Sequence, residues 1–189
     1  MDNRERAVQL LDRMGRIAHG LQFALGLNPA QWEALRFLAL ANRRSRSPSA
    51  LADFLGTTKG TASQTLIALE SKGLVKRTRC VSDRRSVDLE LTPQGVEMIG
   101  RDPMGLVLDA VSELSEGECE TMNGVLGGLV TSLQRRIGLP EFGPCLDCAH
   151  FCEAIAEPEG QSGCRCALSQ DELPQPDLDR VCANFESVA

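Results

Sequence analysis

Six cysteines gather in the last fifty residues of this 189-residue chain, whereas two lie before them. The six are Cys145, Cys148, Cys152, Cys164, Cys166 and Cys182. Cys145 and Cys148 form a C-x2-C pair, which is a common two-ligand grip on a metal. Cys166 and Cys182 follow after 17 and 15 intervening residues. The pattern predicts one metal centre held by these four thiolates, with Cys152 and Cys164 as substitute ligands.

Iron–sulfur clusters and zinc both accept four thiolates, so they compete for this site. The spacing is similar to the four-cysteine pattern of high-potential iron–sulfur proteins. Structural zinc ribbons pair two C-x2-C motifs, but the second motif here is the C-x-C of Cys164 and Cys166. We therefore expect a [4Fe–4S]-type cluster, with zinc as the alternative and a free-thiol or disulfide redox device as a third reading. Cys80 and Cys119 are interpreted as small buried hydrophobes.

Charge divides the chain near the same place. Residues 42–86 hold ten lysines and arginines against three acidic residues, whereas residues 140–189 hold ten acidic residues against two arginines. The basic segment is typical of a nucleic-acid surface, and the acidic end is expected to lie away from phosphate. We expect a domain at residues 1–139 and a Cys-rich module at 140–189 that has too few apolar residues for a core of its own.

Long helical patterns lie at both ends of the first domain. Apolar residues recur at three- and four-residue spacing from Leu10 to Leu25 and again from Cys119 to Ile137, where a capping box begins the helix at Ser115. One small lobe cannot cover both stripes. We expect them to pair across the two-fold axis of a homodimer.

Two short helices between these stripes predict a helix-turn-helix at about residues 47–73. Ser47 and Thr58 are suited to cap the two helices, and Gly56 marks the turn between them. The outward face of the second helix is small and polar, which suits insertion into a DNA major groove. A merely solvated helix face is the alternative.

A hairpin pattern follows at about residues 74–91. Two strand-like runs, LVKR and VDLEL, bracket the polar and basic tip CVSDRRS. A helix-turn-helix followed directly by such a hairpin is a winged helix. The expected fold is mainly α with a small β-wing, carried on N- and C-terminal dimerisation helices, with a small irregular Cys-rich module at the end.

The sequence from Leu51 to Gly95 resembles the core signature of MarR-family regulators. The elements that carry the resemblance are Leu69-Glu70, Gly73-Leu74-Val75, Arg77, Asp83-Arg84-Arg85 and Leu91-Thr92-Pro93-Gln94-Gly95. With the flanking helices it covers roughly residues 5–138, and it implies a two-fold dimer whose terminal helices interlock below two winged lobes. The family usually ends near the last dimerisation helix, so the Cys-rich tail is a departure from it.

The resemblance also implies which residues meet DNA. Those implied at base edges or nearby phosphates are Lys59, Thr61, Ser63 and Gln64. Arg85, together with Arg84, would enter the flanking minor groove, and Asp83 would brace the wing tip because phosphate repels a carboxylate. Arg77 either contacts phosphate or holds the base of the hairpin.

These features point to a cytoplasmic DNA-binding regulator, expected to act as a repressor on an inverted-repeat operator. The chain has no stretch of about 20 apolar residues, no secretion signal, and none of the motifs of a Ser-His-Asp triad, a phosphate loop or a nucleotide fold. We expect the tail's metal centre to sense redox state, oxygen or iron, and to shift the angle between the two lobes through the helix ending near Gly138. The alternative is a small ligand sensed between the dimerisation helices and the lobe, with the tail as a structural zinc clip.

Overall fold

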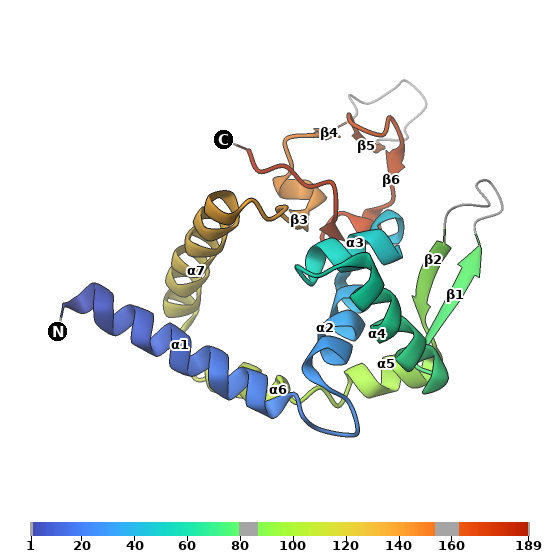
Figure 1. The fold of residues 1–189 in the computed structure, drawn as a ribbon. Coiled ribbons are helices and arrows are strands. Elements are labelled where there is room, and N and C mark those ends of the chain that lie inside the picture. The colour runs from blue at the N-terminus through green and yellow to red at the C-terminus, as the bar shows by residue number, and fades with distance from the viewer. Residues whose placement is uncertain (1, 80–86, 154–162, 189) are drawn as a thin grey trace.

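In the computed structural model, residues 2–79, 87–153 and 163–188 are described, and they form helices, one hairpin and a strand-rich tail (Figure 1). The helices are α1 (Asn3–Leu21), α2 (Pro29–Leu40), α3 (Pro48–Phe54), α4 (Lys59–Ser71), α5 (Pro93–Ile99), α6 (Gly105–Val111) and α7 (Glu116–Ile137). The hairpin pairs β1 (Val75–Arg79) with β2 (Val87–Leu91). None of the described helices is long and apolar enough to cross a membrane.

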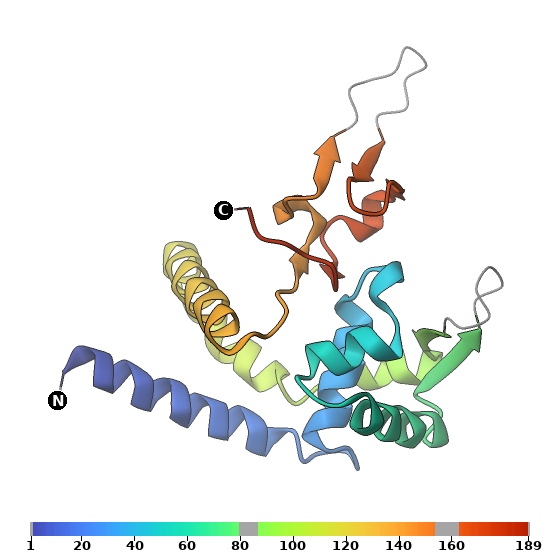
Figure 2. The same cartoon turned by 45° about the horizontal axis from the view of Figure 1, so that its top comes forward.

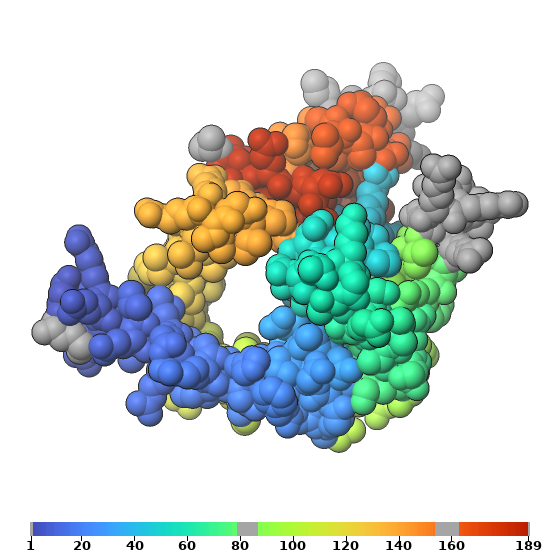
Figure 3. Space-filling model, in the orientation of Figure 1, coloured from blue at the N-terminus to red at the C-terminus, as the bar shows by residue number. Residues whose placement is uncertain are grey.

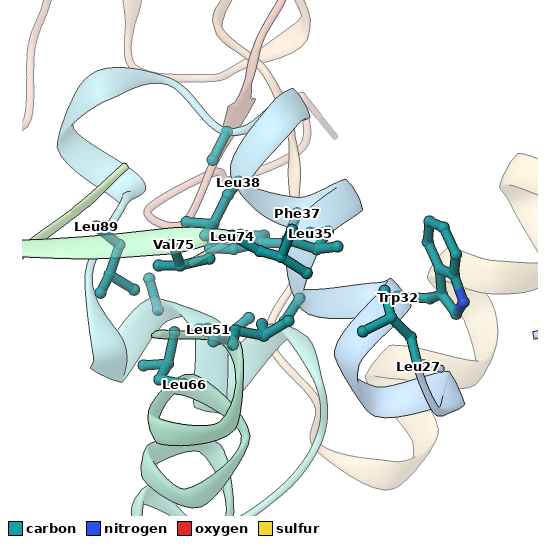
Figure 4. Close-up of a cluster of buried hydrophobic side chains, with 14 residues drawn as sticks. Leu27, Trp32, Leu35, Phe37, Leu38, Leu51, Leu66, Leu74, Val75 and Leu89 are labelled. Carbon is teal, nitrogen blue, oxygen red and sulfur yellow. The ribbon is translucent and has the colours of Figure 1, made fainter. Parts of the chain in front are cut away.

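Helices α2 to α5 and the hairpin form one lobe. The residues with helix-capping side chains fall where the sequence predicts them: Ser47 accepts a hydrogen bond from Ala50 N–H, and Thr58 accepts one from Thr61 N–H. The buried core, drawn in Figure 4, consists mainly of apolar side chains from α2, α3, α4 and the hairpin, and Met98 and Ile99 of α5 pack against it. Its fully buried large members are Trp32, Phe37, Leu35, Leu38, Leu51, Leu66, Leu69, Leu74 and Leu89. This core fixes α4 and the hairpin relative to each other.

A close joint holds α5 against the start of the hairpin. Thr92 caps α5 by accepting from Gly95 N–H (3.0 Å), and its hydroxyl donates to Gly73 O (2.6 Å). A Cβ atom on Gly95 would lie 2.1 Å from the carbonyl oxygen of Leu74. The joint explains physically why the L-T-x-x-G motif ends in glycine.

The terminal helices lie outside this lobe. No residue of α1, α6 or α7 is buried. An opening separates α7 from the lobe in the space-filling view, and α1 runs along the lower edge of this opening (Figure 3). The largely exposed apolar residues of these helices include Val8, Leu10, Met14, Ile17, Leu106, Leu108, Val125, Val130, Leu133 and Ile137. The single chain therefore leaves uncovered the two stripes that the sequence predicts at a dimer axis.

The Cys-rich tail is more regular than expected, because its backbone groups pair in short antiparallel ladders. β3 (Gly143–Pro144) pairs with β7 (Val181–Cys182), and β5 (Cys164–Cys166) lies between β4 (Phe151–Glu153) and β6 (Glu172–Leu173). The tail also has a small apolar cluster of its own, centred on Cys145, Leu173 and Leu178, which the sequence did not lead us to expect. Figures 1 and 2 both place the tail beside α3 and the turn that precedes it.

Candidate nucleic-acid interface and cysteine cluster

Helix α4 presents a polar face to solvent beside the hairpin. Lys59, Thr61 and Gln64 are exposed and Ser63 is half-buried, whereas Ala62 on the opposite face is fully buried. The first turn holds no acidic residue. The face that carries the residues implied to read DNA is therefore accessible.

Arg77 on β1 reaches back to α4. Its Nε lies 2.9 Å from Glu70 Oε2, an ion pair without a well-aligned hydrogen bond, and its Nη2 donates to Ser63 O at 3.3 Å. Both side chains are about 30% exposed. Of the two readings of Arg77 that the sequence left open, these contacts favour the one in which it holds the hairpin base to the helix.

The wing tip lies outside the described residues. Asp83, Arg84 and Arg85, which the sequence assigns to the wing tip and minor groove, fall in it, as does Cys80. Their assignments stay predictions.

The first arginines of the basic segment face the tail. Arg44 forms an ion pair with Asp171. Arg46 Nε donates to Ala41 O (3.2 Å), and burial, together with the charge of Arg180, lowers the pKa of its guanidinium. Part of the charge that marked residues 42–86 as a nucleic-acid surface thus contacts the acidic tail instead.

Short strands and turns gather the cysteines of the tail. A 3₁₀ turn, Cys145–Asp147, places Cys145 near Cys148, and both are buried. The β3–β7 ladder sets Cys182 opposite Gly143, two positions before Cys145. Cys166 lies opposite Phe151, and it packs with Cys182 against the cluster around Cys145.

The other three predicted ligands affect the pKa of the Cys145 thiol. Burial raises its pKa to about 11, and the charges of Cys182, Cys148 and Cys166 contribute to that rise. A hydrogen bond from Asn42 acts in the opposite direction. Because neighbouring thiolates repel one another, deprotonation of this group calls for a bound cation.

The pKa of the Cys166 thiol is shifted in the opposite direction. Burial acts to raise its pKa, but hydrogen bonds from Ser169 and the backbone of Leu168, together with the positive charge of Arg44, outweigh burial and lower it. The two predicted ligands therefore differ in how readily they form thiolates.

Four thiols are suitable ligands for a thiophilic metal or cluster, but in the structure they do not yet surround one point. Among the described residues, no three His, Cys, Asp or Glu side chains are arranged so that they could hold one metal ion. Binding would therefore draw the thiols together. Side chains alternate along a strand, so Cys164 shares a face of β5 with Cys166. Cys152 is exposed and lies opposite Arg165 on the other face, which makes Cys164 the better placed substitute ligand.

Comparisons with known proteins identify the family. A sequence model of the MarR family matches residues 25–86. A putative transcriptional regulatory protein for the hcr operon of Thauera aromatica is 32% identical over 123 residues, covering 60% of this chain and 73% of that protein. The chain belongs to the MarR family.

Solved structures share the fold. A single-residue mutant of MepR from Staphylococcus aureus superposes with a TM-score of 0.55 at 24% identity, over 71% of this chain and all of MepR. A MepR–DNA complex gives 0.53 at 23% identity, over 70% of this chain and 98% of MepR. A cysteine-to-serine mutant of MarR from Escherichia coli gives 0.52 at 22%, over 69% and 98%. More than a quarter of this MarR-family chain therefore has no counterpart in those proteins.

In this MarR-family chain, the tail contacts the lobe at the end of α2 and at the segment between α2 and α3. Asn42 N–H donates to Val181 O, Ala183 N–H donates to Ser45 Oγ, and Arg180 Nη1 donates to Ala39 O, each at 2.8 Å. Sequence reasoning missed Asn42 and Ser45. The signal that could have located this contact is the match between the basic segment 43–46 and the acidic tail.

Proposed function

We propose that this chain is a dimeric DNA-binding transcriptional regulator whose operator affinity depends on a metal centre held by Cys145, Cys148, Cys166 and Cys182. The observation that carries the DNA-binding part is the exposed polar face of α4, braced against the hairpin by Arg77 and Glu70. A helix face of this kind can enter a major groove while the wing follows the backbone. The MepR–DNA complex supports the same use of a shared fold.

Selection of a bound sequence from random duplex DNA tests this part. We expect an inverted repeat with half-sites about one helical turn apart. Gln64→Ala should change the selected sequence, whereas Arg85→Ala should weaken binding by about 1–3 kcal/mol. Arg101→Ala, an exposed arginine beyond α5, is the matched control and should leave affinity unchanged. Unaltered binding by both test variants would contradict the interface.

The dimer is supported by the uncovered apolar faces of α1 and α7. Contiguous apolar surface of this extent marks an interface in soluble proteins. Light scattering at micromolar concentration should give twice the chain mass. A stable monomer would refute this part of the proposal.

The metal centre is supported by the nearness of three thiols, those of Cys148, Cys166 and Cys182, to Cys145. A [4Fe–4S] cluster would supply a redox- and oxygen-sensitive charge, whereas zinc would supply a fixed cross-link. Protein purified without oxygen should be brown and contain iron and sulfide; a colourless preparation with one zinc per chain would support the clip instead. Serine at both Cys145 and Cys148 should abolish binding of either metal. Full metal content in that variant would show that other cysteines are the ligands, with Cys164 the first to test.

A second candidate function is the binding of a small ligand where the terminal helices meet the lobe. The indole N–H of Trp32 is fully buried without a hydrogen-bond partner in the described part of the chain. Arg36, one turn along the same face of α2, pairs with Asp102 after α5 and hydrogen-bonds Gln22 after α1. Trp32 is the sole tryptophan, so quenching of its fluorescence by a library of small aromatic acids tests this candidate directly.

A further inference from the structure

The segment between α2 and α3, residues 41–47, lies between the tail and the wing. On the tail side, Asn42 N–H donates to Val181 O, and Ser45 Oγ accepts from Ala183 N–H. On the wing side, Arg46 O accepts from Leu89 N–H at 2.8 Å. The segment is therefore hydrogen-bonded to both modules of the protein.

Two of the predicted metal ligands act directly on this segment. Cys182 stands between Val181 and Ala183, the two tail residues that bond to it. The Asn42 side chain lies near enough to Cys145 to act on the pKa of its thiol. Asn42 Oδ1 accepts from Ser45 N–H (2.9 Å), which leaves the amide NH2 as the donor group of this side chain.

These polar groups have little freedom to find other partners. Asn42 and Ser45 are each 3% exposed. A buried polar group that loses its hydrogen bond is not compensated by water, so the surrounding backbone must move instead. A change in the position of Cys145 or Cys182 therefore displaces the segment.

The segment in turn positions both parts that meet DNA. Ser45 O accepts from Ser47 N–H (2.8 Å), and Ser47 caps α3, which packs against α4. Arg46 O fixes the middle of β2 and hence the base of the wing. One short path thus joins the cysteines to the helix-turn-helix and to the wing.

We infer that Asn42 is a positioning residue that transmits the state of the cysteine centre to α3 and the wing. The inference rests on the proposed metal centre and DNA binding, and it gives their coupling a route through residues 41–47. The route differs from one through α7 and the dimer axis, because its contacts join the tail directly to the lobe of the same chain.

The test compares metal-loaded and chelator-treated full-length protein. We expect chelation to change affinity for the selected duplex about 5–150-fold and to speed amide exchange in residues 42–51 and 87–91. Asn42→Asp keeps the acceptor for Ser45 N–H but removes the amide NH2, the donor group of this side chain. In this variant the metal content should stay that of the wild type, while the loaded-to-free affinity ratio falls toward unity.

Asn28→Ala is the matched control. Asn28 caps α2 by accepting from Gln31 N–H (3.0 Å), as Asn42 accepts from Ser45, but it lies at the other end of α2. The control should keep the wild-type ratio. If Asn42→Asp loses its metal, the same affinity ratio is measured for Ser45→Ala. This variant removes only the acceptor for Ala183 N–H, and it should also lower the ratio.

Different outcomes test the proposed coupling of metal to DNA affinity and the route through residues 41–47. A wild-type protein without metal, or with the same affinity in both states, overturns the proposed coupling and this inference with it. A wild-type response that persists in metal-loaded Asn42→Asp overturns the inference alone. Exchange that changes in α7 but not in residues 42–51 also overturns it, in favour of the dimer route.

Discussion

The ring of Phe142 meets the ring of Phe54 edge-on, with centroids 5.2 Å apart and planes at 81°. Phe54 in turn lies 4.8 Å from Phe37 in the core. Phe142 precedes the first tail strand, whereas Phe54 ends α3. The start of the tail is therefore anchored on the helix-turn-helix by an aromatic contact, in addition to the hydrogen bonds at residues 41–47.

Phe142→Ala should lower the free energy of unfolding by about 1–3 kcal/mol. The figure is below the ~3–5 kcal/mol of a fully buried phenylalanine, because Phe142 is only partly buried. Denaturant unfolding followed by Trp32 fluorescence measures the loss. Phe23→Ala, an exposed phenylalanine after α1, is the control and should change the midpoint little in the same assay. Equal effects of the two would contradict the anchor.

Gly95→Ala should destabilise the lobe by about 3 kcal/mol, at the upper end of the usual cost of overpacking. The new methyl group would meet the Leu74 carbonyl oxygen, which is backbone and cannot rotate away. Gly60→Ala in the first turn of α4 is the control, since its Cβ would lie 3.7 Å from the nearest atom, Thr58 Oγ1. Thermal melting should show a lower Tm for the first variant alone.

A double-mutant cycle on Glu70 and Arg77 separates the two readings of Arg77. Each single alanine variant should cost at most about 1 kcal/mol of stability, since the pair is partly exposed. If Arg77 only braces the hairpin, Glu70→Ala and Arg77→Ala weaken DNA binding alike. A further loss confined to Arg77→Ala, with a shallower salt dependence, would assign a phosphate contact to it.

Acid should release the tail from its ion pairs in metal-free protein. Hydrogen bonds from Arg44 and Arg135 lower the pKa of Asp171 and of Glu141, respectively, below the ordinary 3.8 and 4.5. A carboxyl group with a lowered pKa stabilises the folded state above its unfolded pKa, and this contribution disappears as pH falls through the folded value. Carboxyl chemical shifts between about pH 5 and 2 should report both transitions. Glu141→Gln should remove one of them; midpoints at the ordinary values would contradict the contacts.

In metal-free, reduced protein, iodoacetamide should modify Cys166 well before Cys145. The thiolate is the nucleophile, and the pKa of Cys145 is raised to about 11 whereas that of Cys166 is lowered. Peptide mass spectrometry over a time course at pH 8 gives the order. Metal loading should protect both, and modification of Cys145 first would show that the thiol cluster is arranged differently.

The lobe was predictable from sequence because its signals are local. Ser47, Thr58 and Thr92 cap helices through bonds that span three residues, and the winged-helix pattern followed from them. The four cysteines chosen by spacing are those whose charges meet at Cys145, although the metal itself stays a prediction. Spacing alone could not show that Cys152 faces away from Cys166, because this depends on strand register.

The docking of the tail could not be predicted in the same way. Charge balance suggested an acidic end that lies away from phosphate, but it did not show that Asp171 pairs with Arg44. The contacts of Asn42 and Ser45 are made by single backbone groups far along the chain. No periodicity or cap motif encodes such partners. The opposite charges of segment 43–46 and the tail could have indicated the contact, but not which residues make it.

The bond between Ser45 and Ala183 joins positions 138 residues apart, and it has a consequence for synthesis of the protein. A chain leaving the ribosome completes α2, α3, α4 and the wing long before residue 183 is made. Until then the buried hydroxyl of Ser45 and the N–H of Asn42 lack the partners they have in the finished molecule. The lobe is thus complete only once residues 181–183 have been made, and a product that stops before residue 181 is expected to be proteolysed faster in that lobe than one that includes them.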